Sequence, residues 1–197
     1  MNKDILICGV GGQGTVLASK IIAAAAMDEG SPVHSAETIG MAQRGGSVTS
    51  HVRIGPDAAS PLIPFGGADL LLAFEPAEAV RNLRYLRKGG TAVVNTSPVR
   101  PVTESLKSSG YDGREMAAYL REKCPCIFVD GDAVCRPLGS AKFLNIVLLG
   151  AAAGAGLLGI STETVMNRIA RQVPPRFLEA NRAAFLAGLE IGAANRS

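Results

Sequence analysis

Short apolar runs typical of buried strands alternate with segments of helical period along most of this chain. The pattern predicts strands over residues 4–10, 33–37, 47–54, 69–74, 91–95 and 126–130. It predicts helices over residues 14–29, 76–88, 113–123, 144–154, 161–171 and 175–193. Strands that alternate with helices are typical of a parallel sheet covered by helices. We therefore expect one α/β domain over residues 1–197, Rossmann-like, with a mostly parallel sheet and a helical C-terminal quarter.

The segment 47–54 alternates with a period of two. Val48, Val52 and Ile54 point one way, and Thr49, His51 and Arg53 point the other way. This alternation predicts a strand with one polar face.

The predicted helix 76–88 has Pro76 in its first turn, with Glu75 and Glu78 near its positive end. Three basic residues follow at helical spacing: Arg81, Arg84 and Lys88. They predict either a solvated helix face or a surface for an acidic partner.

Composition narrows the possible functions. The formal net charge is only +3, and few aromatic residues accompany the scattered basic ones, which argues against nucleic-acid binding. The N-terminal apolar run, 5–10, is too short for a signal peptide, so we expect a cytoplasmic protein. The longest apolar stretch, 143–160, could cross a membrane, but its glycines favour a buried helix that ends in a turn. We expect no membrane association.

The cysteines and histidines do not form a metal site. Cys124 and Cys126 have no second pair at zinc spacing, and no iron–sulfur pattern is present. The four cysteines are therefore expected to be free thiols in a reducing compartment. We expect neither a bound metal nor a catalytic residue in this chain.

A first glycine-rich loop follows the first strand and opens the first helix. Gly9, Gly11 and Gly14 form a G-x-G-x-x-G pattern, with Gly12 and Gln13 inside it. Such a loop can hold a phosphate group at the helix N-terminus, or it can be a tight turn that holds no nucleotide. Gln13 can donate to a ligand or cap the helix. A dinucleotide site also needs an acidic residue after the second strand, and Glu37 is the only candidate.

A second glycine-rich element precedes the strand 47–54. Its residues Gln43, Arg44, Gly45 and Gly46 present an arginine on flexible backbone, and arginine suits bidentate binding of carboxylate or phosphate. His51 and Arg53 follow on one strand face. The element predicts a substrate or subunit-interface site, or alternatively a solvated hairpin edge.

The two loops together resemble a known family. Gly9-Val-Gly-Gly-Gln-Gly14, Met41-Ala-Gln-Arg-Gly-Gly-Ser-Val48 and Ser50-His-Val-Arg53 are similar to the gamma-type domain of 2-oxoacid:ferredoxin oxidoreductases. Further similar segments are Asp69 to Pro76, Lys142 to Asn145 and Asn181 to Leu189. Pyruvate-type members carry a related Arg-Gly-Gly element without the Met-Ala-Gln lead. Within the family, the chain therefore resembles the small subunits of enzymes that oxidise aryl pyruvates such as indolepyruvate.

The resemblance implies a subunit that is inactive alone. Thiamine diphosphate, Mg²⁺ and iron–sulfur clusters would sit on a large alpha subunit, which passes electrons to ferredoxin and an acyl group to coenzyme A. This chain would complete the active-site cleft and help to bind coenzyme A. We expect the loops 11–14 and 43–46 to face the partner subunit, with Arg44 contacting a substrate carboxylate or a coenzyme A phosphate. The candidate cofactor-binding residues are Gly9, Gly11, Gly12, Gln13 and Gly14.

Three alternatives stay open at this point. The chain could be the gamma subunit of a pyruvate- or other 2-oxoacid-specific enzyme. It could be a self-contained NAD(P)-binding Rossmann protein, although 197 residues leave little room for a second substrate domain. It could also be a non-catalytic assembly or regulatory subunit.

Overall fold

The computed structural model describes residues 2–40, 45–99 and 110–196. Its centre is a six-stranded sheet in the order β2-β3-β1-β4-β5-β6. The strands are β1 (Lys3–Val10), β2 (Val33–Ile39), β3 (Ser47–Ile54), β4 (Ala68–Ala73), β5 (Leu86–Asn95) and β6 (Cys126–Val129).

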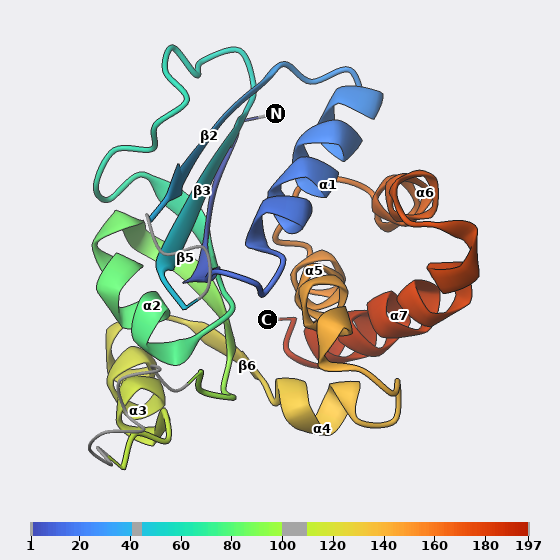
Figure 1. The fold of residues 1–197 in the computed structure, drawn as a ribbon. Coiled ribbons are helices and arrows are strands. Elements are labelled where there is room, and N and C mark those ends of the chain that lie inside the picture. The colour runs from blue at the N-terminus through green and yellow to red at the C-terminus, as the bar shows by residue number, and fades with distance from the viewer. Residues whose placement is uncertain (1, 41–44, 100–109, 197) are drawn as a thin grey trace.

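Helices cover both faces of the sheet (Figure 1). On one face lie α2 (Pro76–Asn82) and α3 (Arg114–Lys123). On the other lie α1 (Thr15–Asp28), α5 (Leu144–Gly154), α6 (Thr162–Gln172) and α7 (Leu178–Ala194). Shorter elements are α4 (Gly131–Cys135) and the 3₁₀ turns η1 (Leu83–Tyr85), η3 (Ala141–Phe143) and η4 (Pro175–Phe177). The predicted α/β class, the mostly parallel sheet and the helical C-terminal region are confirmed.

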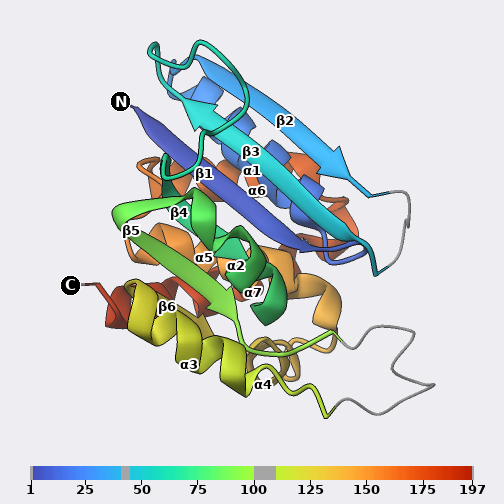
Figure 2. The ribbon, with the colours of Figure 1, turned by 90° about the vertical axis from the view of Figure 1, so that its left-hand side faces the viewer.

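One strand runs against the others. β1 pairs parallel with β4, β4 with β5, and β5 with β6. β3 lies antiparallel between β1 and β2, as the side-by-side strands in Figure 2 show. In a simple parallel unit, β2 would lie beside β1. Here β3 lies between these two strands. The helices after β1 and β4 lie on opposite faces of the sheet (Figure 1), so the carboxyl ends of these two neighbouring strands form the topological switch point of the sheet.

The strands are apolar on both sides because both faces are covered. In β1, Ile5 and Ile7 pack into the core under α1 and α5, whereas Leu6 and Cys8 pack into the smaller core under α2 and α3. All four side chains are fully buried. The continuous apolar run that marked this segment in the sequence follows from that double burial.

Within the apolar stretch 143–160, residues 144–154 form the buried helix α5, which packs along α7 (Figure 1). Glycines permit the close approach. A Cβ on Gly150 would overlap the carbonyl oxygen of Phe185, and a Cβ on Gly188 would overlap that of Val147. Among the described residues, no helix is both long and apolar enough to cross a bilayer.

The predicted helix 76–88 is wrong in its second half. α2 ends at Asn82, and β5 already begins at Leu86, so Lys88 lies in a strand. The predicted basic helix face therefore does not exist. A register shift opposite β4 accommodates the early start of β5, and Gly90 packs there against the Leu86 side chain and the backbone of Ala68. This pairing joins Leu86 to Ala68, 18 positions earlier, and helical spacing does not reveal it.

Candidate functional site

The two glycine-rich loops meet at the carboxyl end of β1. The N–H of Gly11 donates to the carbonyl oxygen of Gly46 over 2.8 Å, and the N–H of Gly45 donates to the carbonyl oxygen of Gly11 over 3.4 Å. The antiparallel pairing of β1 with β3 brings them together, because it sets Val10 opposite Ser47. Two segments that were separate in the sequence thus form one surface.

The first loop needs its glycines for two different reasons. Gly12 and Gly14 have φ angles of 101° and 83°, in the region that L side chains rarely adopt. Gly9 has no room for a side chain, since an added Cβ would lie 2.7 Å from Gln13 Oε1 and 2.8 Å from the Cβ of Phe74. α1 then starts at Thr15 without a side-chain cap.

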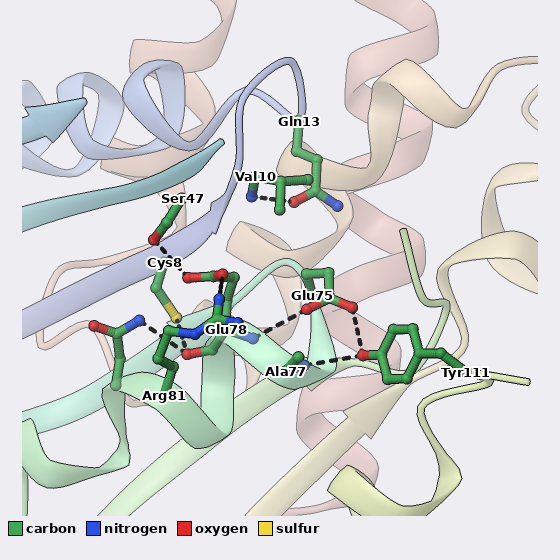
Figure 3. Close-up of polar contacts among 10 residues, drawn as sticks. Cys8, Val10, Gln13, Ser47, Glu75, Ala77, Glu78, Arg81 and Tyr111 are labelled. Carbon is green, nitrogen blue, oxygen red and sulfur yellow. Dashed lines mark hydrogen bonds and ion pairs between the residues drawn. The ribbon is translucent and has the colours of Figure 1, made fainter. Parts of the chain in front are cut away.

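Gln13 is turned into the fold. Its Oε1 accepts from the N–H of Val10 over 2.8 Å, and its Nε2 donates to the carbonyl oxygen of Phe74 over 2.9 Å. Figure 3 shows this side chain reaching back to Val10. The amide therefore links the end of β1 to the end of β4 and does not cap α1, while Gln13 also lines the cavity beside the loop.

A cavity of about 490 Å³ opens beside the first loop. Gly12, Gly14 and Asn145 line it together with Lys142 and Asp132. It lies between the N-terminus of α1 and the start of α5. Its volume falls in the range of small-molecule sites.

The buried residue Asn95 lines this cavity. Its Nδ2 donates to the carbonyl oxygen of Phe74 over 3.0 Å, and its Oδ1 accepts from the N–H of Gly131 over 3.1 Å. One buried amide thus joins the end of β4, the end of β5 and the start of α4. Nothing in the local sequence marks Asn95 for this position.

Two buried carboxylates lie at the N-terminus of α2 (Figure 3). Glu75, 3% exposed, caps the helix by accepting from the N–H of Glu78 over 3.0 Å, and it accepts from the hydroxyl of Tyr111 over 2.6 Å. Glu78, 2% exposed, accepts from the hydroxyl of Ser47 over 2.7 Å and pairs with Arg81. The sequence placed the glutamates at the positive end of a helix but gave no sign of Tyr111 or Ser47, which come from distant segments.

This cluster raises the pKa values of two neighbouring groups. Burial, followed by the hydrogen bond to Glu75, raises the pKa of the Tyr111 phenol well above its usual value. Burial, followed by the charges of Glu78 and Glu75, raises the pKa of the Cys8 thiol. Both groups are therefore neutral at neutral pH and act as hydrogen-bond donors, Cys8 toward the carbonyl oxygen of Glu78.

His51 and Arg53 lie away from the glycine-rich loops. His51 sits in the middle of β3, 4% exposed, where its Nδ1 accepts from the N–H of Ile63 over 3.1 Å. Burial lowers its pKa. Arg53 pairs with Asp4 at the other end of β1, over 2.9 Å, and donates to the carbonyl oxygen of Ser60. Neither side chain is brought to the shared loop surface.

Glu37 is not placed like the acidic residue of a dinucleotide site. β3 separates β2 from β1, so Glu37 is two strands away from the first loop. Its Oε1 accepts from the hydroxyl of Ser19 over 3.2 Å. Gln43 and Arg44 lie outside the described residues, whereas Gly45 and Gly46 lie within them.

Metal ligands do not cluster in the part of the chain that the structure describes, where no group of three His, Cys, Asp or Glu side chains could hold an ion. All four cysteines are free, as predicted. Cys124 and Cys126 lie closest, with 3.5 Å between their sulfur atoms.

Comparison with known proteins identifies the class. The family model for pyruvate ferredoxin/flavodoxin oxidoreductase matches residues 4–191, and the chain belongs to this family. The gamma subunit of keto/oxoacid ferredoxin oxidoreductase from Geobacter sulfurreducens has the same fold, with a TM-score of 0.71 at 26% identity; the match covers 98% of this chain and 99% of that one.

Curated relatives narrow the class further. The chain is 38% identical over 190 residues to indolepyruvate oxidoreductase subunit IorB of Archaeoglobus fulgidus, covering 95% of this chain and 94% of the relative. It is 37% identical over 199 residues to the subunit of the same name in Methanothermobacter thermautotrophicus, covering all of both chains. The chain is thus a small subunit of a 2-oxoacid:ferredoxin oxidoreductase, and the resemblance found in its sequence is confirmed.

Proposed function

We propose that this chain, one domain over its length, serves an enzyme that oxidises aryl pyruvates such as indolepyruvate. The 2-oxoacid loses carbon dioxide, its acyl group passes to coenzyme A, and the electrons released reduce ferredoxin. The names of the relatives support the aryl substrate. The four free cysteines agree with a reducing cytoplasm as the place of this reaction.

One observation supports the share of this chain in that reaction. Two glycine-rich loops are hydrogen-bonded into one surface, Gly11 to Gly46 over 2.8 Å, at the carboxyl end of β1 beside its parallel neighbour β4. The helices after these two strands lie on opposite faces of the sheet (Figure 1), and ligands of open α/β sheets bind at such switch points. We infer that this surface faces a large subunit and completes its active-site cleft.

The cofactors belong on that large subunit. Family complexes generally use thiamine diphosphate and iron–sulfur clusters. The cysteines of this chain do not fit a cluster, because Cys8 and Cys135 are buried and only Cys124 and Cys126 lie together. Thiamine diphosphate with Mg²⁺ would supply the decarboxylation chemistry on the partner, and this chain would supply walls of the cleft and contacts to coenzyme A.

Arg44 gives the sharpest test of a binding role. It adjoins Gly45, whose N–H bonds the first loop, so the joined surface includes its neighbour in sequence. We expect Arg44→Ala in the complex to raise the Michaelis constant for the 2-oxoacid or for coenzyme A, with Arg182→Ala on α7 as the charge-matched control. Unchanged constants for both substrates at normal turnover would remove Arg44 from the site.

Co-expression with a large subunit tests the assignment itself. We expect a brown complex that oxidises indolepyruvate only when coenzyme A is present. Full activity of the large subunit alone would instead support an assembly role. A preference for pyruvate would assign the chain to another member of the family, and tight NADH binding by the isolated chain would favour the dinucleotide alternative, which the position of Glu37 disfavours.

A further inference from the structure

The cavity beside the first glycine-rich loop contains the uncapped end of a long helix. α1 spans 14 residues, and its first intrahelical bond is from the N–H of Ala18 to the carbonyl oxygen of Gly14. In the described part of the chain, the N–H groups of Thr15, Val16 and Leu17 find no acceptor. A helix N-terminus with free N–H groups carries partial positive charge and favours an anion.

Asn145 provides a second and independent indication of a ligand. The residue is only 5% exposed, and its Oδ1 accepts from the N–H of Ile146 over 2.9 Å. That bond fixes the orientation of the amide, so its NH₂ group points away from α5. Nδ2 has no hydrogen-bond partner among the described residues, and Asn145 lines the cavity, so this NH₂ group is free to donate to a bound ligand.

The free amide lies directly over the start of α1. A Cβ built on Gly14 would be only 2.7 Å from Asn145 Nδ2, so any larger residue at position 14 would displace it. Gly14 and Asn145 both line the same cavity of about 490 Å³. Glycine at this position therefore serves the contact with the amide as well as the positive φ angle.

Two exposed charges stand at the cavity. Lys142 lines it and makes no ion pair with the described residues, whereas Asp132 lines it with a carboxylate of opposite sign. Pro98, Val99 and Leu144 add apolar wall. The cavity is therefore larger than a single inorganic anion needs and fits an anion that carries an organic portion.

We propose that this cavity binds the phosphate group of an organic ligand. The phosphate would accept from the N-terminal N–H groups of α1 and from Asn145 Nδ2, with Lys142 at the rim, while the rest of the ligand lies along the apolar wall. The inference deepens the proposed function and rests on it only for the identity of the ligand, since a phosphate-bearing acyl acceptor is one substrate of that reaction.

Titration calorimetry of inorganic pyrophosphate into the full chain, in buffer free of other polyvalent anions, tests the site. We expect Asn145→Ala to weaken binding roughly tenfold, because it removes a donor to a charged group. Lys142→Ala should weaken binding several-fold, and Asp132→Asn should strengthen it. Lys20→Ala, which removes an exposed charge on α1 outside the cavity, should leave it unchanged.

Each outcome decides the proposal. Saturable binding that follows this pattern supports it. Absence of saturable binding at millimolar pyrophosphate, or equal losses for Lys142→Ala and Lys20→Ala, overturns it. If Asn145→Ala does not fold, the pyrophosphate affinities of Lys142→Ala and Asp132→Asn decide between these outcomes, because both side chains are exposed. The measurement needs no partner subunit, so a chain that binds pyrophosphate but supports no 2-oxoacid oxidation would refute the proposed function and leave the site intact.

Discussion

Gln13 offers a direct test of how the first glycine-rich loop is held. Its side chain bonds the N–H of Val10 and the carbonyl oxygen of Phe74, so Gln13→Ala removes two hydrogen bonds at the ends of β1 and β4. The substitution has different consequences for the backbone groups at the two strand ends. Phe74 keeps the bond from Asn95 Nδ2 at 3.0 Å, whereas the buried N–H of Val10 is left without an acceptor.

The magnitude follows from that asymmetry. A typical hydrogen bond contributes about 1 kcal/mol net, and an orphaned buried donor costs about 1–3 kcal/mol. We expect Gln13→Ala to lower the free energy of unfolding by roughly 2–3 kcal/mol, which for a chain of this size shifts the melting temperature by roughly 5–10 °C.

Urea denaturation followed by circular dichroism measures this loss. Gln172→Ala, at an exposed glutamine in the last turn of α6, is the matched control and should stay within about 0.5 kcal/mol of the parent chain. A Gln13→Ala variant as stable as this control would show that the amide does not fasten the strand ends, and the description of the loop would have to change.

Three further predictions concern other parts of the fold. Gly188→Leu should destabilise the chain by more than about 3 kcal/mol, because α5 and α7 would have to separate; a soluble variant with the parent melting temperature would contradict this packing. One of the three tyrosines should resist ionisation in an ultraviolet titration, since Tyr111 has a raised pKa. The folded state then holds this proton longer than the unfolded state, so stability should fall as pH rises above about 10, and Tyr111→Phe should flatten that fall. Alkylation at pH 8 followed by mass spectrometry should modify Cys124 before Cys126, because the hydrogen bond between the thiols lowers the pKa of Cys124 and raises that of Cys126; the reverse order would contradict this ranking of the two pKa values.

The local pattern of apolar and polar residues was sufficient to predict much of the fold. Period two predicted β3 with its observed bounds, and apolar continuity with terminal glycine predicted α5. These elements are decided by side chains close in sequence. The early start of β5 was missed, because it depends on pairing with Ala68 rather than on the residues of β5 itself.

The candidate site was predictable only in part. Both glycine-rich loops stood out, since positive φ angles and close approaches require glycine within a short span. Their contact through Gly11 and Gly46 was not visible, because it depends on β3 entering the sheet beside β1. The bond from Tyr111 to Glu75 spans 36 positions and has no local signal.

The inserted strand also has a consequence for how the chain folds. β2 and β3 are sequence neighbours and can pair early, but β1 gains both of its neighbours, β3 and β4, only from later segments. Contacts between distant segments form slowly, since their loop closure costs more entropy. We therefore expect the loop surface to become ordered after the β2–β3 pair. Pulsed hydrogen exchange should then protect the Gly11 amide later than the amides between β2 and β3, and simultaneous protection would show that the strands join the sheet in one step.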